Sequence, residues 1–370
     1  MKYNTLTELS FFKGKRVFIT GHTGFKGSWL CRILIDAGAI VTGYALEPVA
    51  GFSLFELSGV KEEINHNIGD IRNLEELDRV VKECQPDIVI HLAAQPIVKY
   101  GYDNPRETYE INVMGWINLL ECIRRLGCVK SVLNVTTDKV YLNYGYDYVY
   151  EEECALDGFD PYSNSKSCSE LVTHSYRKSY LSNMGVAIST VRSGNVIGGG
   201  DFTKGRIIPD CVYSVINNEK IVLRNPNSIR PYQHVLDPLF AYLLICYKQY
   251  ENNLLGGEYN IGPASNECKS TIEIINLFSK KWGENIKYIY NTSKTFHEDE
   301  YLRLNCSKIK EIMGWKPIWN IDIAVEKVVE WTRNWLNGGD MKICMREQIN
   351  EYKNTLVCVK STNNFHSITT

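Results

Sequence analysis

The chain has 370 residues, of which 44% are hydrophobic, and its formal net charge is −2. This composition is typical of a globular protein, and the small charge argues against nucleic acid or an anionic membrane as a partner. No apolar run is long enough to span a bilayer, and residues 1–12 lack the pattern of a signal peptide. We therefore expect a cytoplasmic protein with two domains, or with one large domain and an appendage.

The cysteines predict no metal site. The chain has 12 of them, but none forms a C-x-x-C pair and none clusters with histidines at the spacing of metal ligands. In a cytoplasmic chain such cysteines are usually reduced and act as small apolar side chains.

The segment 17–37 carries a nucleotide-binding pattern. An apolar run at 17–19 predicts a buried strand, and apolar residues recur at helical spacing over 29–37. Three glycines stand between them: Gly21, Gly24 and Gly27. A strand, a glycine turn and a helix in this order place backbone N–H groups and the positive end of a helix around an anion. We predict that this turn binds the pyrophosphate of a dinucleotide.

Strands and helices alternate through the first half of the chain. Further strands are predicted at 40–46, 64–68, 88–92, 131–136 and 186–192, with helices at 54–57, 74–81 and 105–126 between them. This rhythm predicts an α/β fold with a doubly wound parallel Rossmann sheet, which we assign to residues 12–195. Ligands of such sheets bind at the carboxyl ends of the strands.

The residues just past the strand ends favour NAD over NADP. Asp70 follows the third strand and can accept a hydrogen bond from an adenine amino group, although it can also cap the next helix. The small side chains of Ala93 and Ala94 leave room for a nucleotide. After the second strand the first acid comes late, at Glu47, and no arginine is present there to receive a 2′-phosphate.

A tyrosine and a lysine at helical spacing indicate acid–base chemistry. Pro161 is suited to a helix start, so Tyr162 and Lys166 lie one turn apart on one face of the helix. An ammonium group near a phenol favours the phenolate, which makes Tyr162 a candidate base at neutral pH. Thr137, at the end of the fifth strand, can bind the same substrate hydroxyl.

These motifs together resemble the CDP-glucose 4,6-dehydratases, a family of extended short-chain dehydrogenases/reductases that act on nucleotide sugars. The segments that carry the resemblance are GHTGFKG at 21–27, AAQP at 93–96, TDK at 137–139, YSNSK at 162–166, GNVIGGGD at 194–201 and IRPYQHV at 229–235. Related dehydratases have a glutamate where this chain has Lys139. The resemblance covers about nine-tenths of the chain.

The resemblance implies a tightly held NAD and an internal redox cycle on CDP-glucose. Tyr162 would take the C4 hydroxyl proton, Asp138 would protonate the leaving C6 hydroxyl, and Lys139 would either remove the C5 proton or stabilise the enolate. The residues predicted to contact the cofactor are Gly21, His22, Thr23, Gly24, Phe25, Lys26, Gly27, Asp70, Ile71, Ala93, Ala94, Gln95, Thr136, Tyr162 and Lys166. Alternatives are a dehydratase of another nucleotide sugar (dTDP-glucose or GDP-mannose), a 4-epimerase, and a dinucleotide-sensing binding protein.

Beyond residue 195 the regular alternation of strands and helices ends. We expect a smaller α/β substrate-binding domain over 196–340, some of whose segments return to the first domain. The glycine-rich bend at 193–201, in which Asn195 is embedded, is suited to close approach of a phosphate or sugar. The predicted substrate contacts are Asn195, Arg206, Arg230, His234, Glu298 and Tyr301, with the arginines placed for a diphosphate. Residues 341–370 are left as a C-terminal extension. Relatives pair through helices that correspond to 107–126 and 162–181, which implies a homo-oligomer, either a dimer or a tetramer.

Overall fold

A seven-stranded parallel sheet forms the centre of the computed structural model, which describes residues 5–48, 51–223, 225–263, 267–290 and 301–366, with their side chains from 8 through 358. The strand order is β12-β7-β5-β4-β1-β2-β3, and every neighbouring pair is parallel. The strands are β1 (Arg16–Thr20), β2 (Ile40–Ala45), β3 (Asn65–Ile68), β4 (Ile88–His91), β5 (Ser131–Val135), β7 (Ala187–Ser193) and β12 (Glu258–Ile261). The predicted doubly wound sheet is confirmed.

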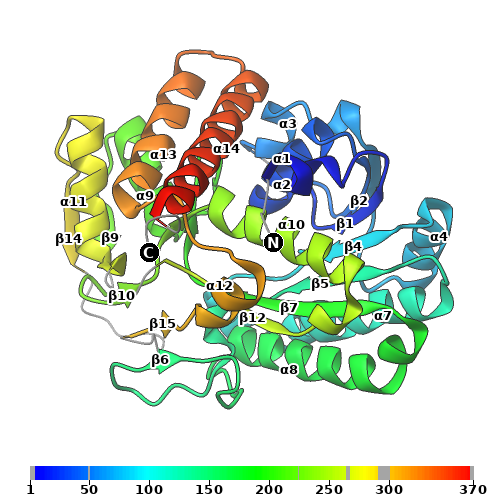
Figure 1. Ribbon diagram of the computed structural model, residues 1–370. Coiled ribbons are helices and arrows are strands. Elements are labelled where there is room, and N and C mark those ends of the chain that lie inside the picture. The colour runs from blue at the N-terminus through cyan, green and yellow to red at the C-terminus, as the bar shows by residue number, and fades with distance from the viewer. Residues whose placement is uncertain (1–4, 49–50, 224, 264–266, 291–300, 367–370) are drawn as a thin grey trace.

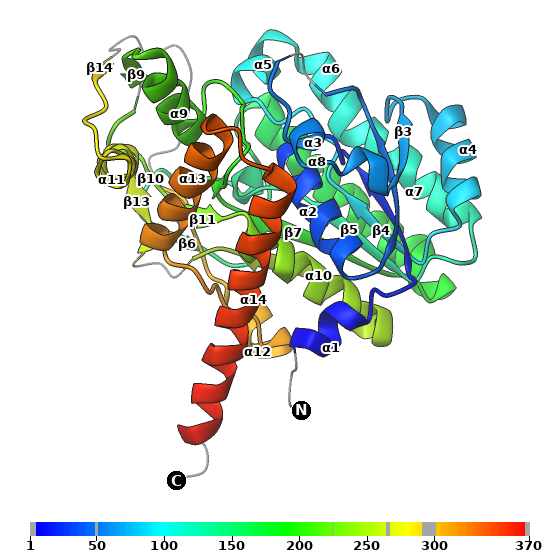
Figure 2. The same cartoon turned by 90° about the horizontal axis from the view of Figure 1, so that it is seen from above.

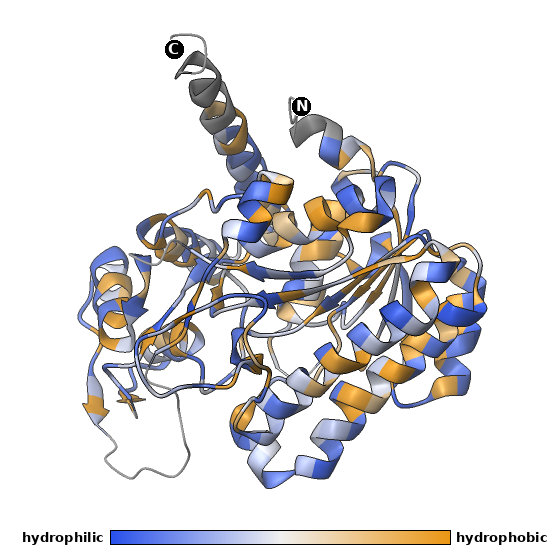
Figure 3. Ribbon diagram, turned by 60° about the horizontal axis from the view of Figure 1, so that its bottom comes forward, coloured by the Kyte–Doolittle hydropathy of each residue, from blue (hydrophilic) through white to orange (hydrophobic). Residues whose placement is uncertain are grey.

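Helices cover both faces of the sheet, which explains why inner strands such as β1 and β4 are largely apolar (Figure 1). One face packs against α2 (Phe25–Asp36) and α10 (Leu236–Glu251), and the other against α4 (Leu74–Cys84), α7 (Gly115–Arg125) and α8 (Pro161–Tyr176). The outer helices in Figure 3 alternate hydrophobic with hydrophilic residues, as expected of helices that bury one side. The predicted helix at 105–126 is built from α6 (Pro105–Tyr109), a π-helical turn at 110–114 and α7.

The chain reverses its direction of winding between β1 and β4. From β1 it proceeds outward through β2 and β3, and it then returns to place β4 on the other side of β1. The connections therefore diverge at the carboxyl ends of β1 and β4. In open α/β sheets this switch point forms the ligand crevice.

Residues beyond β7 form a second, smaller group of elements around its own cluster of buried apolar residues (Figure 2). It contains the strand pairs β8 (Val196–Ile197) with β11 (Gln233–His234), β9 (Ile221–Leu223) with β14 (Tyr288–Tyr290), and β10 (Ile229–Arg230) with β13 (Lys269–Ser270). Its helices are α9 (Ile207–Asn217), α11 (Thr271–Trp282) and α13 (Ile321–Leu336). Two segments of the same range, α10 and β12, belong instead to the layers of the central sheet.

The short remaining elements connect these layers at the surface. They are α1 (Thr5–Ser10), α3 (Leu54–Leu57), α5 (Val98–Asp103), α12 (Ser307–Met313), and the strand pair β6 (Val149–Tyr150) with β15 (Arg303–Leu304).

Residues 341–366 of the C-terminal extension form a helix that no pattern in the sequence predicted. Helix α14 (Met341–His366) packs its first half against the core through Met345 and Tyr352, and its second half projects from the body (Figure 2). The buried hydroxyl of Tyr352 donates to Asp237 Oδ1 at 2.7 Å. Of the helices in the described ranges, none has the length and apolar character needed to cross a membrane.

Candidate functional site

A cavity of about 880 Å³ lies at the carboxyl edge of the sheet, at the switch point. One wall consists of the residues that follow β1 to β5, and the opposite wall consists of residues from α9, β9 and β10. The volume is within the range of cofactor and substrate pockets, and at the upper end of it.

The glycine turn forms the floor of this cavity because it has no room for side chains. A Cβ on Gly21, whose φ is +75°, would lie 2.7 Å from the backbone nitrogen of Ala93, and a Cβ on Gly27 would lie 2.3 Å from the carbonyl oxygen of Gly21. Gly24 precedes the first residue of α2 and lines the cavity. The N-terminus of this helix thus borders the cavity, as required for an anion.

The structure brings most of the predicted cofactor contacts together around one cavity. The predicted residues that line it are Gly21, Thr23, Gly24, Phe25, Lys26, Gly27, Asp70, Ile71, Ala93, Ala94, Thr136, Tyr162 and Lys166. Arg72 donates to both carboxylate oxygens of Asp70 and lowers the pKa of that carboxyl, so the carboxylate stays ionised and each oxygen can accept a further hydrogen bond.

His22 and Gln95 lie behind the cavity wall and are not among the residues that line it. The His22 ring is buried beneath the glycine turn, and its Nε2 lies 2.6 Å from His66 Nδ1. Gln95 donates to Thr108 Oγ1 at 2.9 Å and accepts from the backbone nitrogen of Ile97. Both positions are structural, so the predicted cofactor contacts of these two side chains do not fit the geometry.

The predicted catalytic residues converge on the same cavity from β5 and α8. Thr137, Asp138 and Lys139 form a turn directly after β5, and all three line the cavity together with Tyr162 and Lys166. The hydroxyl of Thr137 donates to Asp138 Oδ1 at 3.1 Å.

Asp160 fixes the start of α8, because its Oδ1 accepts from the backbone nitrogens of Tyr162 and Ser163 at 3.0 Å each. Further along the helix, Lys166 Nζ donates to the carbonyl oxygen of Val135 at 3.1 Å. Tyr162 and Lys166 therefore have fixed positions relative to the end of β5.

Burial is the largest influence on the pKa values of Tyr162 and Lys166. It raises the pKa of Tyr162 to about 12, although a hydrogen bond with Thr137 and the charge of Arg206 act in the opposite direction. Burial also lowers the pKa of Lys166 to about 8. In the protein by itself, desolvation of the phenolate is therefore the larger effect, and the pKa of Tyr162 lies above its ordinary value.

Several cations face the cavity. Arg206 Nη1 lies 3.2 Å from Asp201 Oδ2, and the buried Arg230 lies on β10. Desolvation, with the nearby charges of Arg206 and Lys166, lowers the pKa of Lys26 to about 8. A doubly charged diphosphate would relieve this repulsion between cations.

The predicted substrate contacts separate into two groups. Asn195, Arg206 and Arg230 line the cavity. His234 does not, because its fully buried ring packs 4.8 Å from the ring of Trp319 and its Nδ1 accepts from the backbone nitrogen of Leu236. Tyr301 pairs with Ile229 outside the lining, and Glu298 lies outside the described residues.

Other lining residues were not predicted. Asp201 was visible in the glycine-rich segment but received no role, and Tyr232, Asn225, Ser228 and Thr271 also line the cavity. Asn225 and Ser228 belong to the loop between β9 and β10, and only Thr271, from α11, comes from a distant part of the chain. Within the glycine-rich bend, Gly194, Asn195 and Asp201 line the cavity. Gly199 instead serves packing, because a Cβ on it would lie 2.0 Å from the Trp331 side chain.

Comparisons with known proteins agree with this geometry. The family model described as GDP-mannose 4,6 dehydratase matches residues 18–328. A CDP-glucose 4,6-dehydratase of Salmonella typhimurium is 42% identical over 353 residues, which cover 94% of this chain and 98% of the relative. The chain therefore belongs to the family of nucleotide-sugar 4,6-dehydratases that this model describes, as the resemblance of its motifs indicated.

Solved structures match the fold at lower identity. The epimerase Mth375 of Methanothermobacter thermautotrophicus has a TM-score of 0.78 at 22% identity, with 90% of this chain and 96% of that chain covered. A dTDP-glucose 4,6-dehydratase of Bacillus anthracis, in complex with NAD, has a TM-score of 0.73 at 23% identity, with coverage of 86% and 96%.

The lowered pKa of Lys26 predicts proton uptake when a diphosphate binds. Bound negative charge raises this pKa above about 8, so ADP binding should take up protons near that pH and should weaken as the pH rises through it. Calorimetry of ADP binding in two buffers with different ionisation enthalpies measures the uptake. Lys26→Met should reduce the uptake and leave the part contributed by Lys166; the same uptake in both proteins would contradict the assignment.

Proposed function

We propose that this protein binds NAD and converts CDP-glucose to CDP-4-dehydro-6-deoxy-glucose. The proposal rests chiefly on one observation, the convergence of Tyr162, Lys166 and the turn 137–139 on a cavity floored by a glycine turn and a helix N-terminus. The 42% identity with a CDP-glucose 4,6-dehydratase over nearly the full length of both chains supports the choice of substrate.

The residues around the glycine turn fit NAD. The N-terminus of α2 and the Lys26 ammonium suit a pyrophosphate, and Gly69 to Ile71 with Ala93 and Ala94 form a narrow wall for the adenosine. When bound, NAD supplies the acceptor for the C4 hydride of the sugar and the donor that returns it to C6.

In the oxidation half of the reaction, Tyr162 removes the proton of the C4 hydroxyl while Thr137 hydrogen-bonds the same oxygen. Lys166, anchored to the carbonyl oxygen of Val135, holds a positive charge beside the phenolate. The resulting C4 ketone makes the C5 proton acidic, because the carbanion is delocalised as an enolate.

In the elimination half, the C5 proton and the C6 hydroxyl leave as water. Lys139 takes the C5 proton, and Asp138, which lies beside it and is 2% exposed, protonates the C6 oxygen as the C–O bond breaks. A purely electrostatic role for Lys139 is the alternative, in which its ammonium stabilises the enolate oxygen. Either role requires the position that Lys139 has at the cavity wall.

A 4-epimerase is the second candidate, because epimerases share the fold and the tyrosine–lysine pair. An epimerase inverts C4 without removing water, so it does not need an acid and a base at positions 138 and 139. The acidic and basic side chains of this turn therefore favour the dehydratase. A binding protein without catalysis would not require Tyr162 and Lys166 to be ordered at the cavity.

The organisation around this site is part of the proposal. We assign 12–195 to cofactor binding and catalysis, 196–340 to substrate binding and 341–370 to an extension, in a cytoplasmic protein. We also propose a homo-oligomer that pairs through the segments 107–126 and 162–181, because Met114, Leu171 and Tyr180 on these segments leave exposed apolar surface. Sedimentation of the purified chain should give at least the mass of a dimer, and a purely monomeric profile would exclude this pairing.

Product analysis tests the proposed reaction. Purified protein with NAD should convert CDP-glucose to a sugar nucleotide that has lost one water and gained the base-labile absorbance of a 4-keto-6-deoxy sugar. Tyr162→Phe should lower the rate by roughly 10²–10⁴-fold, because the hydroxyl that carries the proton is removed. Conversion of UDP-glucose, dTDP-glucose or GDP-mannose in preference to CDP-glucose would refute the substrate, and formation of a C4 epimer would refute the reaction class.

Two substitutions of Lys139 distinguish a base from an electrostatic stabiliser. Lys139→Ala removes both functions, whereas Lys139→Arg keeps the charge but does not readily give up a proton. If Lys139 is the base, both variants should lose deuterium incorporation from solvent at C5 and should still reduce NAD during C4 oxidation. Exchange restored by arginine would assign the stabilising role instead.

A further inference from the structure

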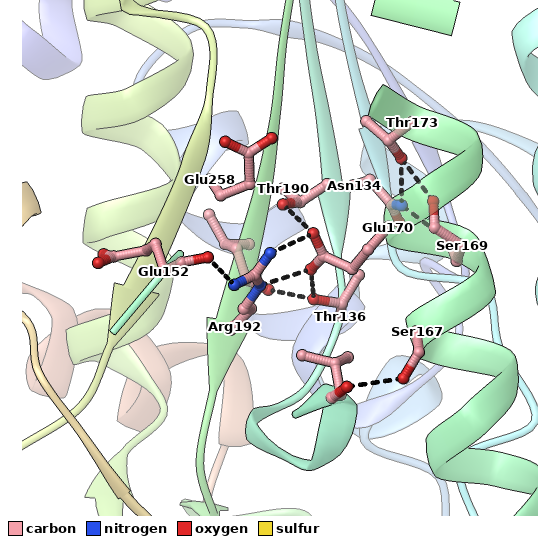
Figure 4. Close-up of polar contacts among 12 residues, drawn as sticks. Asn134, Thr136, Glu152, Ser167, Ser169, Glu170, Thr173, Thr190, Arg192 and Glu258 are labelled. Carbon is pink, nitrogen blue, oxygen red and sulfur yellow. Dashed lines mark hydrogen bonds and ion pairs between the residues drawn. The ribbon is translucent and has the colours of Figure 1, made fainter. Parts of the chain in front are cut away.

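A buried ion pair lies behind the catalytic turn, between α8 and β7. Glu170 is 3% exposed and Arg192 is 2% exposed, and neither is among the residues that line the cavity. Arg192 Nε and Nη2 each lie 3.0 Å from an oxygen of the Glu170 carboxylate (Figure 4). This bidentate geometry fixes the relative position of the helix and the strand.

The pair is hydrogen-bonded to both flanks of the turn 137–140. On the N-terminal side, Thr136 Oγ1 donates to Glu170 Oε1 at 2.5 Å. On the C-terminal side, Arg192 Nη1 donates to the hydroxyl of Tyr141 at 2.9 Å. The turn that carries the proposed acid and base is thus held at both ends by one ion pair.

Helix α8 provides a third attachment. Ser167 Oγ donates to the carbonyl oxygen of Val140, the last residue of the turn, at 2.7 Å. Because Tyr162 and Lys166 belong to the same helix, one rigid element positions both groups of catalytic residues.

Stability alone does not explain a buried ion pair at this place. The desolvation of two charges often offsets their attraction, and a well-packed apolar pair is commonly as stable. An ion pair differs from an apolar contact in its directionality, because each hydrogen bond allows only a narrow range of positions.

We propose that Glu170 and Arg192 are positioning residues that set the distance between the turn 137–140 and the Tyr162–Lys166 pair. The inference rests on the proposed function, since it concerns the alignment of the residues assigned to that reaction. Its consequence is a loss of kcat without a matching loss of substrate binding when the pair is disturbed.

The charge of Glu170 has a second effect, on Lys166 one turn earlier in the helix. Burial lowers the pKa of Lys166 to about 8, and the Glu170 carboxylate acts in the opposite direction. Glu170→Gln should therefore lower this pKa further and move the alkaline limb of the pH–kcat profile to lower pH.

Two other substitutions form a matched pair. Tyr141→Phe removes a link between the ion pair and the turn. Thr190→Val removes the hydrogen bond of 2.5 Å that the Thr190 hydroxyl, on β7 and outside the turn, donates to Oε2 of the same carboxylate. Both changes delete one buried hydroxyl and nearly conserve the side-chain volume. Tyr141→Phe also deletes the hydrogen bond that this hydroxyl donates to Asn260 Oδ1 at 2.6 Å, so we expect the larger loss of stability in that variant.

We expect the three variants to differ in kcat. Glu170→Gln and Tyr141→Phe should lower kcat, by roughly a hundred-fold for Glu170→Gln, with little change in KM. Thr190→Val should keep a kcat close to that of the unmodified protein. Equal losses of kcat in Tyr141→Phe and Thr190→Val, or an unchanged kcat and pH profile in Glu170→Gln, would overturn the proposal.

Hydrogen exchange keeps this test independent of the substrate. Backbone amides of 137–142 should exchange faster in Glu170→Gln and Tyr141→Phe than in Thr190→Val, with or without activity. Protein that lacks dehydratase activity but shows this pattern would refute the proposed function alone, whereas uniform exchange across the variants would refute the positioning role. If Glu170→Gln does not fold, the comparison of Tyr141→Phe with Thr190→Val decides the matter.

Discussion

The lack of space at the first turn is the constraint on which the site depends. The backbone of Gly21 lies against Ala93, and Gly27 lies against Gly21, so no side chain fits at either position. This contact lets the N-terminus of α2 reach the sheet edge between β1 and β4. Helix α2 also carries Trp29, whose Nε1 donates to the carbonyl oxygen of Gly199 at 3.0 Å. The contact between Gly21 and Ala93 therefore positions the helix N-terminus that borders the cavity. The hydrogen bond from Trp29 connects the same helix to the segment 193–201.

Much of the fold could be predicted because its signals are local. Buried parallel strands are short apolar runs, and the turn glycines, the Pro161 helix start and the tyrosine–lysine spacing each lie within one element. For the same reason the residues predicted around 137–139 and 162–166 do line one cavity. These motifs specify the strand ends, and parallel topology brings the strand ends together.

What the sequence did not reveal depends on contacts between distant segments. His22 and His234 look like polar site residues in their motifs, but their rings pack against His66 and Trp319, which come from other elements. The bend at 193–201 lines the cavity at both ends, but Gly199 near its C-terminal end lies against the side chain of Trp331 from α13. Helix α14 was missed because its apolar face is defined only by the core on which it packs. Local composition cannot distinguish a polar residue that faces a ligand from one that is satisfied inside the protein.

The balance between burial and charge decides how the tyrosine acts. Burial raises the pKa of Tyr162 to about 12, so the protein by itself holds this residue as a phenol near neutral pH. A phenol held in this way becomes a base only when further positive charge arrives beside it, as an oxidised nicotinamide would provide. Loss of that charge on reduction would favour the protonated phenol again. The proton taken from the C4 hydroxyl would then stay on Tyr162 for as long as the hydride stays on the cofactor, which is the order that an internal redox cycle requires.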